Sequence, residues 1–155
     1  MPTVELRFTA LPAHVRTARL LAAVLARRAG IDEGLIDEVK LAVGEACARA
    51  VGIHQAHAAD AEVEVHLSDD DGHFAVAVRD HGPSDADSAV EAIGAPLAEL
   101  PDLFSVSEST APGPAEYGLA VIAGLVDDVG VSRADPGTVV RMAWALTPAE
   151  TQPAT

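Results

Sequence analysis

The sequence has one cysteine and no long uninterrupted apolar segment, and each of these features excludes a class of protein. Cys47 has no second cysteine to pair with, so no internal disulfide can form and secretion gains no support. Its apolar helical surroundings predict a buried, unreactive thiol. Hydrophobic residues make up 49% of the 155 positions, but no run approaches the roughly 18 to 20 apolar residues that span a bilayer. The N-terminus also lacks the basic-then-apolar pattern of a signal peptide, so we expect a cytoplasmic protein that does not contact a membrane.

Basic residues are scarce as well. The chain has 10 Lys and Arg against 24 Asp and Glu, which gives a formal net charge of −14. This charge repels phosphate backbones, and the few basic residues form no long stripe, so we expect no direct binding to nucleic acid. The first predicted helix is nevertheless basic and contains Arg16, Arg19, Arg27 and Arg28. Two interpretations of this helix stay open, namely simple solvation and docking of an acidic partner surface.

The first half of the chain alternates between the strand period and the helix period. Residues 3–8 alternate as a strand, and residues 12–29 have helical spacing that begins at a proline and stops at Gly30. A second helix is predicted from about residue 32 to residue 53. The segments "AEVEVHLS" and "HFAVAVRD" then read as two strands joined by the hairpin turn "DDDG".

The second half begins with a stretch rich in proline and glycine. Residues 83–114 are predicted to form a long lid-like loop, with one short helix around residues 87–94. A helix at 115–129 and strands at 128–133 and 138–146 follow, and residues 147–155 read as a disordered tail. The order of elements predicts one α+β domain over residues 1–146, a two-layer sandwich with helices on one face of a mixed, mostly antiparallel sheet.

A carboxylate and a hydroxyl are predicted to meet at one edge of this sheet. Asp80 follows Val78 on the apolar face of its strand, and a charge in that position needs a donor as its partner. The alternative is that the strand ends at Arg79 and Asp80 caps a turn. Thr138 begins the apolar face of the last strand, and if the two strands are antiparallel, Asp80 and Thr138 lie together. Such an edge suits a flat heterocycle with an exocyclic amino group.

Five motifs occur in the order found in the GHKL ATPases, which have the Bergerat-type ATP-binding fold. They are "EACARA" on a helix, "DHG" after a strand, a long loop, "YGLAV" at a helix start and "GT" at the last strand. The segment "LRFTALPAHVRTARL" before them resembles the start of the bacterial anti-sigma factors of the serine-protein kinase type. This resemblance covers roughly residues 3–146.

The resemblance implies roles for individual residues. Glu45 matches the catalytic base, and Asp80 matches the aspartate that receives the adenine amino group. Gly82 and Thr138 match the remaining adenine-site residues, and Gly118 matches the second glycine of the phosphate-side box. Arg19 matches the partner-contacting arginine of the first helix. Arg16 of the same basic helix is a further partner-binding candidate.

Two departures from the family pattern affect the nucleotide site. The asparagine that binds magnesium in active members is replaced by Arg49, and a guanidinium has no oxygen to offer Mg²⁺. The first glycine of the phosphate-side box is Glu116, whose carboxylate competes with phosphate at a helix N-terminus. ATP or ADP binding is therefore an open expectation, and the site argues against Mg²⁺. No other metal site is expected, since His54 and His57 read as histidines at a helix end.

Three interpretations of Arg49 stay open. Arg49 contacts the phosphates, or it pairs with Glu45 one helical turn away on a solvated flank, or it fills a site that no longer binds nucleotide. The resemblance implies a transcription regulator that sequesters a sigma factor and is controlled by a STAS-domain antagonist, which it phosphorylates on serine with ATP. The alternative is a nucleotide-independent pseudokinase that acts only by binding proteins. A homodimer is also plausible from the resemblance.

Overall fold

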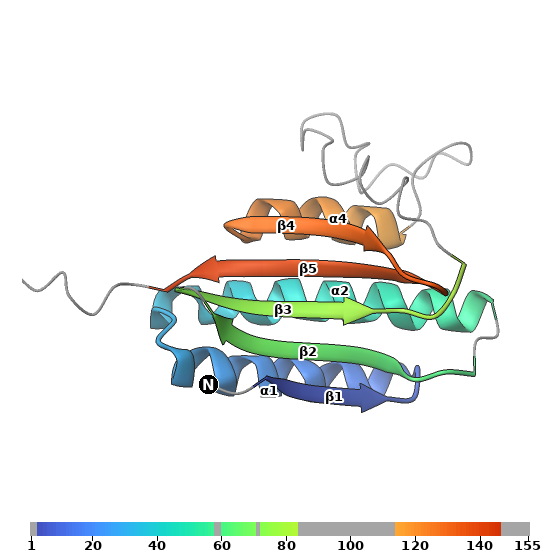
Figure 1. The fold of residues 1–155 in the computed structure, drawn as a ribbon, viewed down its shortest axis with the longest axis horizontal. Coiled ribbons are helices and arrows are strands. Elements are labelled where there is room, and N and C mark those ends of the chain that lie inside the picture. Colours follow the sequence, from blue (N-terminus) through green and yellow to red (C-terminus); the bar gives the residue numbers. More distant parts are fainter. Residues whose placement is uncertain (1–2, 58–59, 71, 84–113, 147–155) are drawn as a thin grey trace, which may run out of the picture.

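A computed structural model describes residues 3–57, 60–70, 72–83 and 114–146, and within them the chain forms two layers (Figure 1). Five strands form one sheet in the order β1-β2-β3-β5-β4, and every pairing is antiparallel. The helices all lie on one face of this sheet (Figure 1). The predicted α+β two-layer sandwich is therefore confirmed, although the described sheet is antiparallel throughout and not mixed.

The elements follow one another in nearly the predicted order. They are β1 (Val4–Phe8), α1 (Pro12–Ala29), the 3-10 turn η1 (Glu33–Leu35), α2 (Ile36–Ala56), β2 (Val63–Asp70), β3 (His73–Arg79), α4 (Pro114–Leu125), β4 (Asp128–Arg133) and β5 (Thr138–Ala145). The predicted lid at 83–114, its short helix and the tail at 147–155 lie almost wholly outside the described residues.

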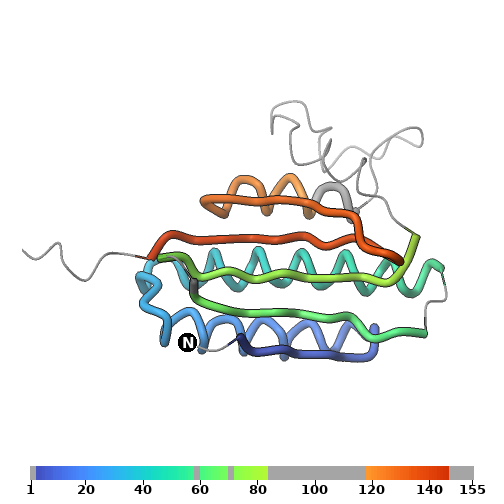
Figure 2. The backbone as a smooth tube through the Cα atoms, in the orientation of Figure 1, coloured from blue at the N-terminus to red at the C-terminus, as the bar shows by residue number. Residues whose placement is uncertain are grey.

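Local sequence signals account for the ends of the first two helices. Pro12 occupies the first turn of α1, where its missing N–H costs nothing. Gly30 ends α1 in the left-handed conformation with φ 104°, which glycine adopts without a Cβ penalty. Ahead of α2, the Asp32 side chain accepts a hydrogen bond from the backbone N–H of Gly34 at 3.2 Å. The two helices therefore run antiparallel through a short connection, as Figure 2 shows.

The core lies between the helices and the inner face of the sheet. Phe74, Val76 and Val78 of β3 are buried and stand directly opposite Trp144, Met142 and Val140 of β5. This is the period-two arrangement predicted for both strands. The Trp144 Nε1–H also donates to the backbone carbonyl of Leu125 at 3.2 Å, which ties the central sheet to the end of α4.

α2 lies in the middle of the helix layer and packs against both α1 and α4. Its small side chains, which include Ala42, Ala46, Cys47 and Ala50, are buried and allow close approach to the sheet. Burial raises the pKa of the Cys47 thiol to about 12, because a thiolate is poorly solvated in an apolar interior. The buried thiol is thus as predicted. No helix in the described part of the chain is both long and apolar enough to cross a bilayer.

Candidate functional site

The candidate site is formed where the turn after β3 meets the central helix α2. β3 ends at Arg79, and Asp80 directly after it is fully buried, as the strand alternation predicts. Its Oδ1 also accepts from the Gly82 N–H, so the alternative in which Asp80 caps a turn holds as well. Its backbone N–H donates to the carbonyl of Thr138 at 3.1 Å, and Thr138 is also fully buried. The antiparallel pairing of β3 with β5 thus brings the two predicted residues together at one edge of the sheet.

Arg49 is the partner of the buried Asp80 carboxylate. Arg49 Nη1 donates to Asp80 Oδ2 at 3.1 Å, and both side chains are almost completely removed from solvent. A buried carboxylate requires such a partner, because an isolated charge in the interior is very costly. Arg49 is 4% exposed, which contradicts one of its three open interpretations, namely a pair with Glu45 on a solvated helix flank.

Two glycines permit the close packing around Asp80. The backbone N–H of Gly82 donates to Asp80 Oδ1 at 3.1 Å, and a Cβ added at Gly82 would lie 2.3 Å from Ile53 Cγ2. Gly137 has φ 102°, and a Cβ there would lie 1.8 Å from the carbonyl oxygen of Asp80. Only glycine fits at Gly137, since both the backbone conformation and the contact exclude a side chain. Gly137 was not among the predicted site residues, although it directly precedes Thr138.

His54 supports the same turn from α2 and was also missed. Its ring is buried, and Nε2 accepts the backbone N–H of His81 at 2.8 Å. Burial lowers the pKa of His54, and the nearby Asp80 carboxylate partly offsets this effect. His54 lies in the last turn of α2, as predicted, but its contact with the turn after β3 was not predicted. Its position four residues after the buried Ala50 and seven after the buried Cys47 was the available signal.

A cavity of about 440 Å³ opens between α2 and α4 beside this turn. Its lining is mostly apolar and consists of Glu45, Ala48, Arg49, Gly52, Ile53, Ala56, His57 and Gly118. Its volume suits a small molecule. Glu45 reaches α4, because a Cβ added at Gly118 would lie 2.9 Å from Glu45 Oε2. The predicted residues Glu45, Arg49 and Gly118 thus share one cavity, whereas Asp80 lies behind Arg49 and does not line it.

The residues present do not fit the nucleotide and metal that the resemblance implies. The adenine amino group would need the Asp80 carboxylate, whose Oδ2 already accepts from Arg49. Magnesium would need an oxygen ligand where the guanidinium stands. The side chain of Glu116 lies outside the described residues. The site is therefore a cavity whose lining residue Arg49 forms a buried ion pair with Asp80.

Arg16 and Arg19, the predicted partner-binding residues, lie away from this cavity on α1. Both side chains are exposed. The carbons of Arg19 lie along α2, since a Cβ added at Gly44 would be 2.8 Å from Arg19 Cδ. Gly44 thus leaves room for the Arg19 side chain to cross the groove between the two helices. The structure does not bring either arginine to the candidate site.

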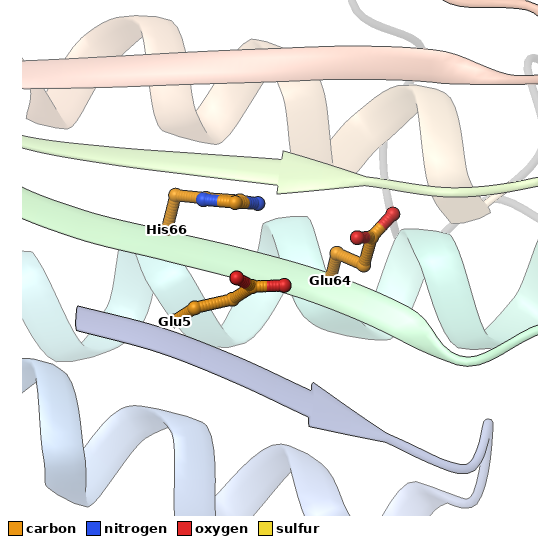
Figure 3. A group of neighbouring side chains, drawn as sticks. All are labelled: Glu5, Glu64 and His66. Carbon is orange, nitrogen blue, oxygen red and sulfur yellow. The ribbon is translucent and has the colours of Figure 1, made fainter. Parts of the chain in front are cut away.

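A second group of polar side chains lies on the sheet face that carries no helix (Figure 3). Ligand atoms of Glu5, Glu64 and His66 lie within 4.8 Å of one another. Arg7 pairs with Glu5 and also approaches Glu64 at 3.4 Å, and His81 Nε2 lies 3.0 Å from Glu64 Oε2. These neighbours compensate both carboxylates, so we interpret the group as an ion-pair network.

The fold is an α+β sandwich with a cavity between α2 and α4, next to the buried Asp80 at the sheet edge. The comparisons with known proteins identify its family. The model of the histidine kinase-like ATPase domain matches residues 8–144. The chain belongs to this family.

Among solved structures, the chain is similar to the RsbU and RsbW domains of Rv1364c from Mycobacterium tuberculosis. The identity is 20%, the TM-score is 0.64, and the match covers 96% of this chain and 34% of that one. The chain thus spans about a third of that protein, and the similarity establishes the shared fold. No curated protein matches the sequence significantly.

Proposed function

We propose that the chain is an anti-sigma factor that holds a sigma factor by protein contact and is controlled by a STAS-domain antagonist, without needing Mg-ATP. Membership of the histidine kinase-like ATPase family and the similarity to a structure with an RsbW domain support the regulator class. The single observation that carries the nucleotide-independent mode is the buried ion pair between Arg49 and Asp80.

The ion pair opposes adenine binding for an energetic reason. An incoming amino group would have to displace the guanidinium from Asp80 and so break a buried ion pair. Removing one member of a buried pair typically costs about 3–5 kcal/mol, whereas one neutral hydrogen bond returns about 1 kcal/mol. Arg49 also cannot supply the oxygen ligand that Mg²⁺ requires. The chain therefore keeps the carboxylate of the family's adenine site, but Arg49 occupies this carboxylate and offers no ligand to Mg²⁺.

Calorimetric titration with Mg-ATP and Mg-ADP tests the nucleotide-independent mode. We expect no saturable binding to the wild-type chain and measurable binding to Arg49→Asn, in which Asp80 is uncovered. The cognate sigma factor should bind the wild-type chain equally well with and without nucleotide. Wild-type affinity for ATP that disappears in Asp80→Asn would falsify this proposal, because Asp80 would then be receiving the base.

A second candidate function is ATP-dependent phosphorylation of the antagonist on serine, and one observation favours it. Glu45 lines the cavity beside Gly118, and among the described residues its carboxylate has no ion-pair partner. In this role Glu45 would take the proton of the attacking serine hydroxyl. Incubation of the antagonist with γ-labelled ATP distinguishes the two functions. Label on serine that is lost in Glu45→Gln supports the kinase, and unlabelled antagonist that still binds the chain supports the first proposal.

A further inference from the structure

The sheet face that carries no helix holds a group of metal-ligating side chains on the edge strand β1 and its neighbour β2. Glu5 of β1 stands directly opposite His66 of β2. Glu64 lies two positions before His66, and residues two apart in a strand share a face. Ligand atoms of all three lie within 4.8 Å of one another, on the side of the strands away from the helices (Figure 3). The group was not predicted from the sequence, because β1 and β2 are far apart in the chain.

The donor atoms of this group suit a transition-metal dication. One imidazole nitrogen with two carboxylate oxygens is a mixed set that Zn²⁺ accepts, with water in its fourth position. Ligand atoms around a tetrahedral Zn²⁺ lie about 3.3 Å apart, because the bonds are about 2.0–2.1 Å long. Small side-chain rotations bring the three atoms, now within 4.8 Å, to that separation. Mg²⁺ and Ca²⁺ prefer oxygen ligands alone, so the His66 nitrogen selects against them.

Arg7 is the cation that holds both carboxylates in the ion-pair network. Its Nε pairs with Glu5 Oε1, and its Nη2 lies 3.4 Å from Glu64 Oε1. The Arg7 side chain is 58% exposed. Exposed ion pairs stabilise a fold little, because solvent screens the charges and the long side chains lose rotamer freedom. A dication that contacts both carboxylates therefore displaces Arg7 at small cost, and the released guanidinium is solvated by water.

Glu64 stays oriented when Arg7 leaves. Its Oε2 lies 3.0 Å from His81 Nε2 and 3.9 Å from Arg79 Nε, whereas Arg7 approaches Oε1. A hydrogen bond of this kind commonly fixes a carboxylate that binds a metal, and Oε1 is the oxygen that becomes available. His66 is exposed and has no hydrogen-bond or ion-pair partner among the described residues, so its ring can turn to bind the metal without breaking a contact.

We propose that Zn²⁺ binds to Glu5, Glu64 and His66 in place of Arg7 and so joins the edge strand β1 to β2. This site lies on the opposite face of the sheet from the helices (Figure 1) and from the cavity between α2 and α4. It is therefore independent of whether the chain binds a sigma factor or a nucleotide.

Calorimetric titration with ZnCl₂ tests the site on the full chain, purified without a histidine tag and freed of metal with a chelator. His66→Ala and Glu64→Gln each remove one ligand. His73→Ala is the matched control, because His73 is an exposed histidine at the start of β3 on the same face of the sheet. Arg7→Gln removes the competing cation. Circular dichroism of each metal-free variant verifies that the fold is retained.

We expect one Zn²⁺ per wild-type chain and a Kd at least about tenfold higher in His66→Ala and in Glu64→Gln. His73→Ala should stay within about twofold of the wild type. Arg7→Gln should bind Zn²⁺ about three- to tenfold more tightly, because no guanidinium competes for the carboxylates. Zn²⁺ should also raise the Tm of the wild type but not that of His66→Ala, since it binds the folded chain at this site.

Three outcomes overturn the proposal. If Zn²⁺ did not bind saturably, or if His66→Ala kept the wild-type Kd within about twofold, the group would be an ion-pair network only. If MgCl₂ or CaCl₂ bound as tightly as ZnCl₂, the chain would attract cations through its acidic surface without a built site. If Arg7→Gln weakened Zn²⁺ binding, Arg7 would support the metal and not compete with it.

Discussion

Arg49 of α2 donates to the carboxylate of Asp80 across 3.1 Å, although 31 positions separate the two residues in the chain. This contact links the central helix to the turn after β3 at the point where related ATPases are expected to receive a base. Both members are buried, so the energetic consequences of removing one differ from those of removing both. The first prediction follows from this asymmetry.

Arg49→Met should lower the free energy of unfolding by about 3–5 kcal/mol, because it leaves the buried Asp80 carboxylate without the guanidinium. Asp80→Asn should also lower it, because it removes the carboxylate that Arg49 Nη1 contacts. The double variant leaves no charge, so its loss should be clearly smaller than the sum of the two single losses. Urea denaturation of the four proteins gives the coupling energy. Additive losses would mean that the two side chains do not stabilise each other.

The stability of the protein should fall in acid partly because of His54. Burial lowers the pKa of His54 in the folded state, so the unfolded chain takes up a proton at higher pH than the folded chain. The contribution of neutral His54 is therefore fully present above its ordinary pKa of about 6.5 and is lost as the pH falls below that value. Asp80 and His81 are the charged or titratable groups that act on it.

Urea unfolding from about pH 8 to pH 5 measures this dependence. His54→Gln keeps an acceptor for the His81 N–H but does not titrate, so its stability should fall less steeply than that of the wild type. The difference in slope should approach about 1.4 kcal/mol per pH unit for one proton. His57→Gln is the control, because His57 is exposed. If the free energy of unfolding changed with pH at the same slope in wild type and His54→Gln, His54 would not contribute to the loss of stability in acid.

Gly137→Ala should be much more destabilising than Gly30→Ala. Both glycines have a positive φ near 100°, so both substitutions carry a conformational penalty of about 1–2 kcal/mol. A Cβ at Gly137 would also lie 1.8 Å from the Asp80 carbonyl oxygen, whereas nothing lies within 4 Å of one at Gly30. Thermal melting of the two variants isolates the contact from the conformational penalty. Equal shifts in Tm would show that the turn after β3 can move away from Gly137.

Cys47 should react with a thiol reagent only when the protein unfolds. Its pKa is raised to about 12 by burial, so the thiolate is essentially absent from the folded protein at neutral pH. Because Cys47 is the only cysteine, the labelling rate with a disulfide reagent reports a single site. We expect labelling at the rate of unfolding in native buffer and fast labelling in urea. Fast labelling of the native protein would indicate local opening of α2.

The sequence by itself determined the layers of the fold and much of the site's frame. Strand alternation in residues 73–80 placed Asp80 on the inner face, and the same period in residues 138–145 placed Thr138 there. Pro12 and Gly30 predicted the two ends of α1. These features depend on side-chain periodicity and on backbone preferences of single residues, which are local properties that a sequence pattern reports directly.

Only the tertiary structure decided what Arg49 and His54 do. Helical projection placed Arg49 on a flank of the apolar stripe, with three interpretations open, and His54 near a helix end. Nothing in the helix itself indicated the turn after β3 as their partner. The close approach of Gly137 to the Asp80 backbone could not be predicted from the sequence either. Each of these contacts joins segments far apart in the chain, and the cost of burying a charge or a ring depends on which distant group meets it. That partner is set by how the helices pack on the sheet.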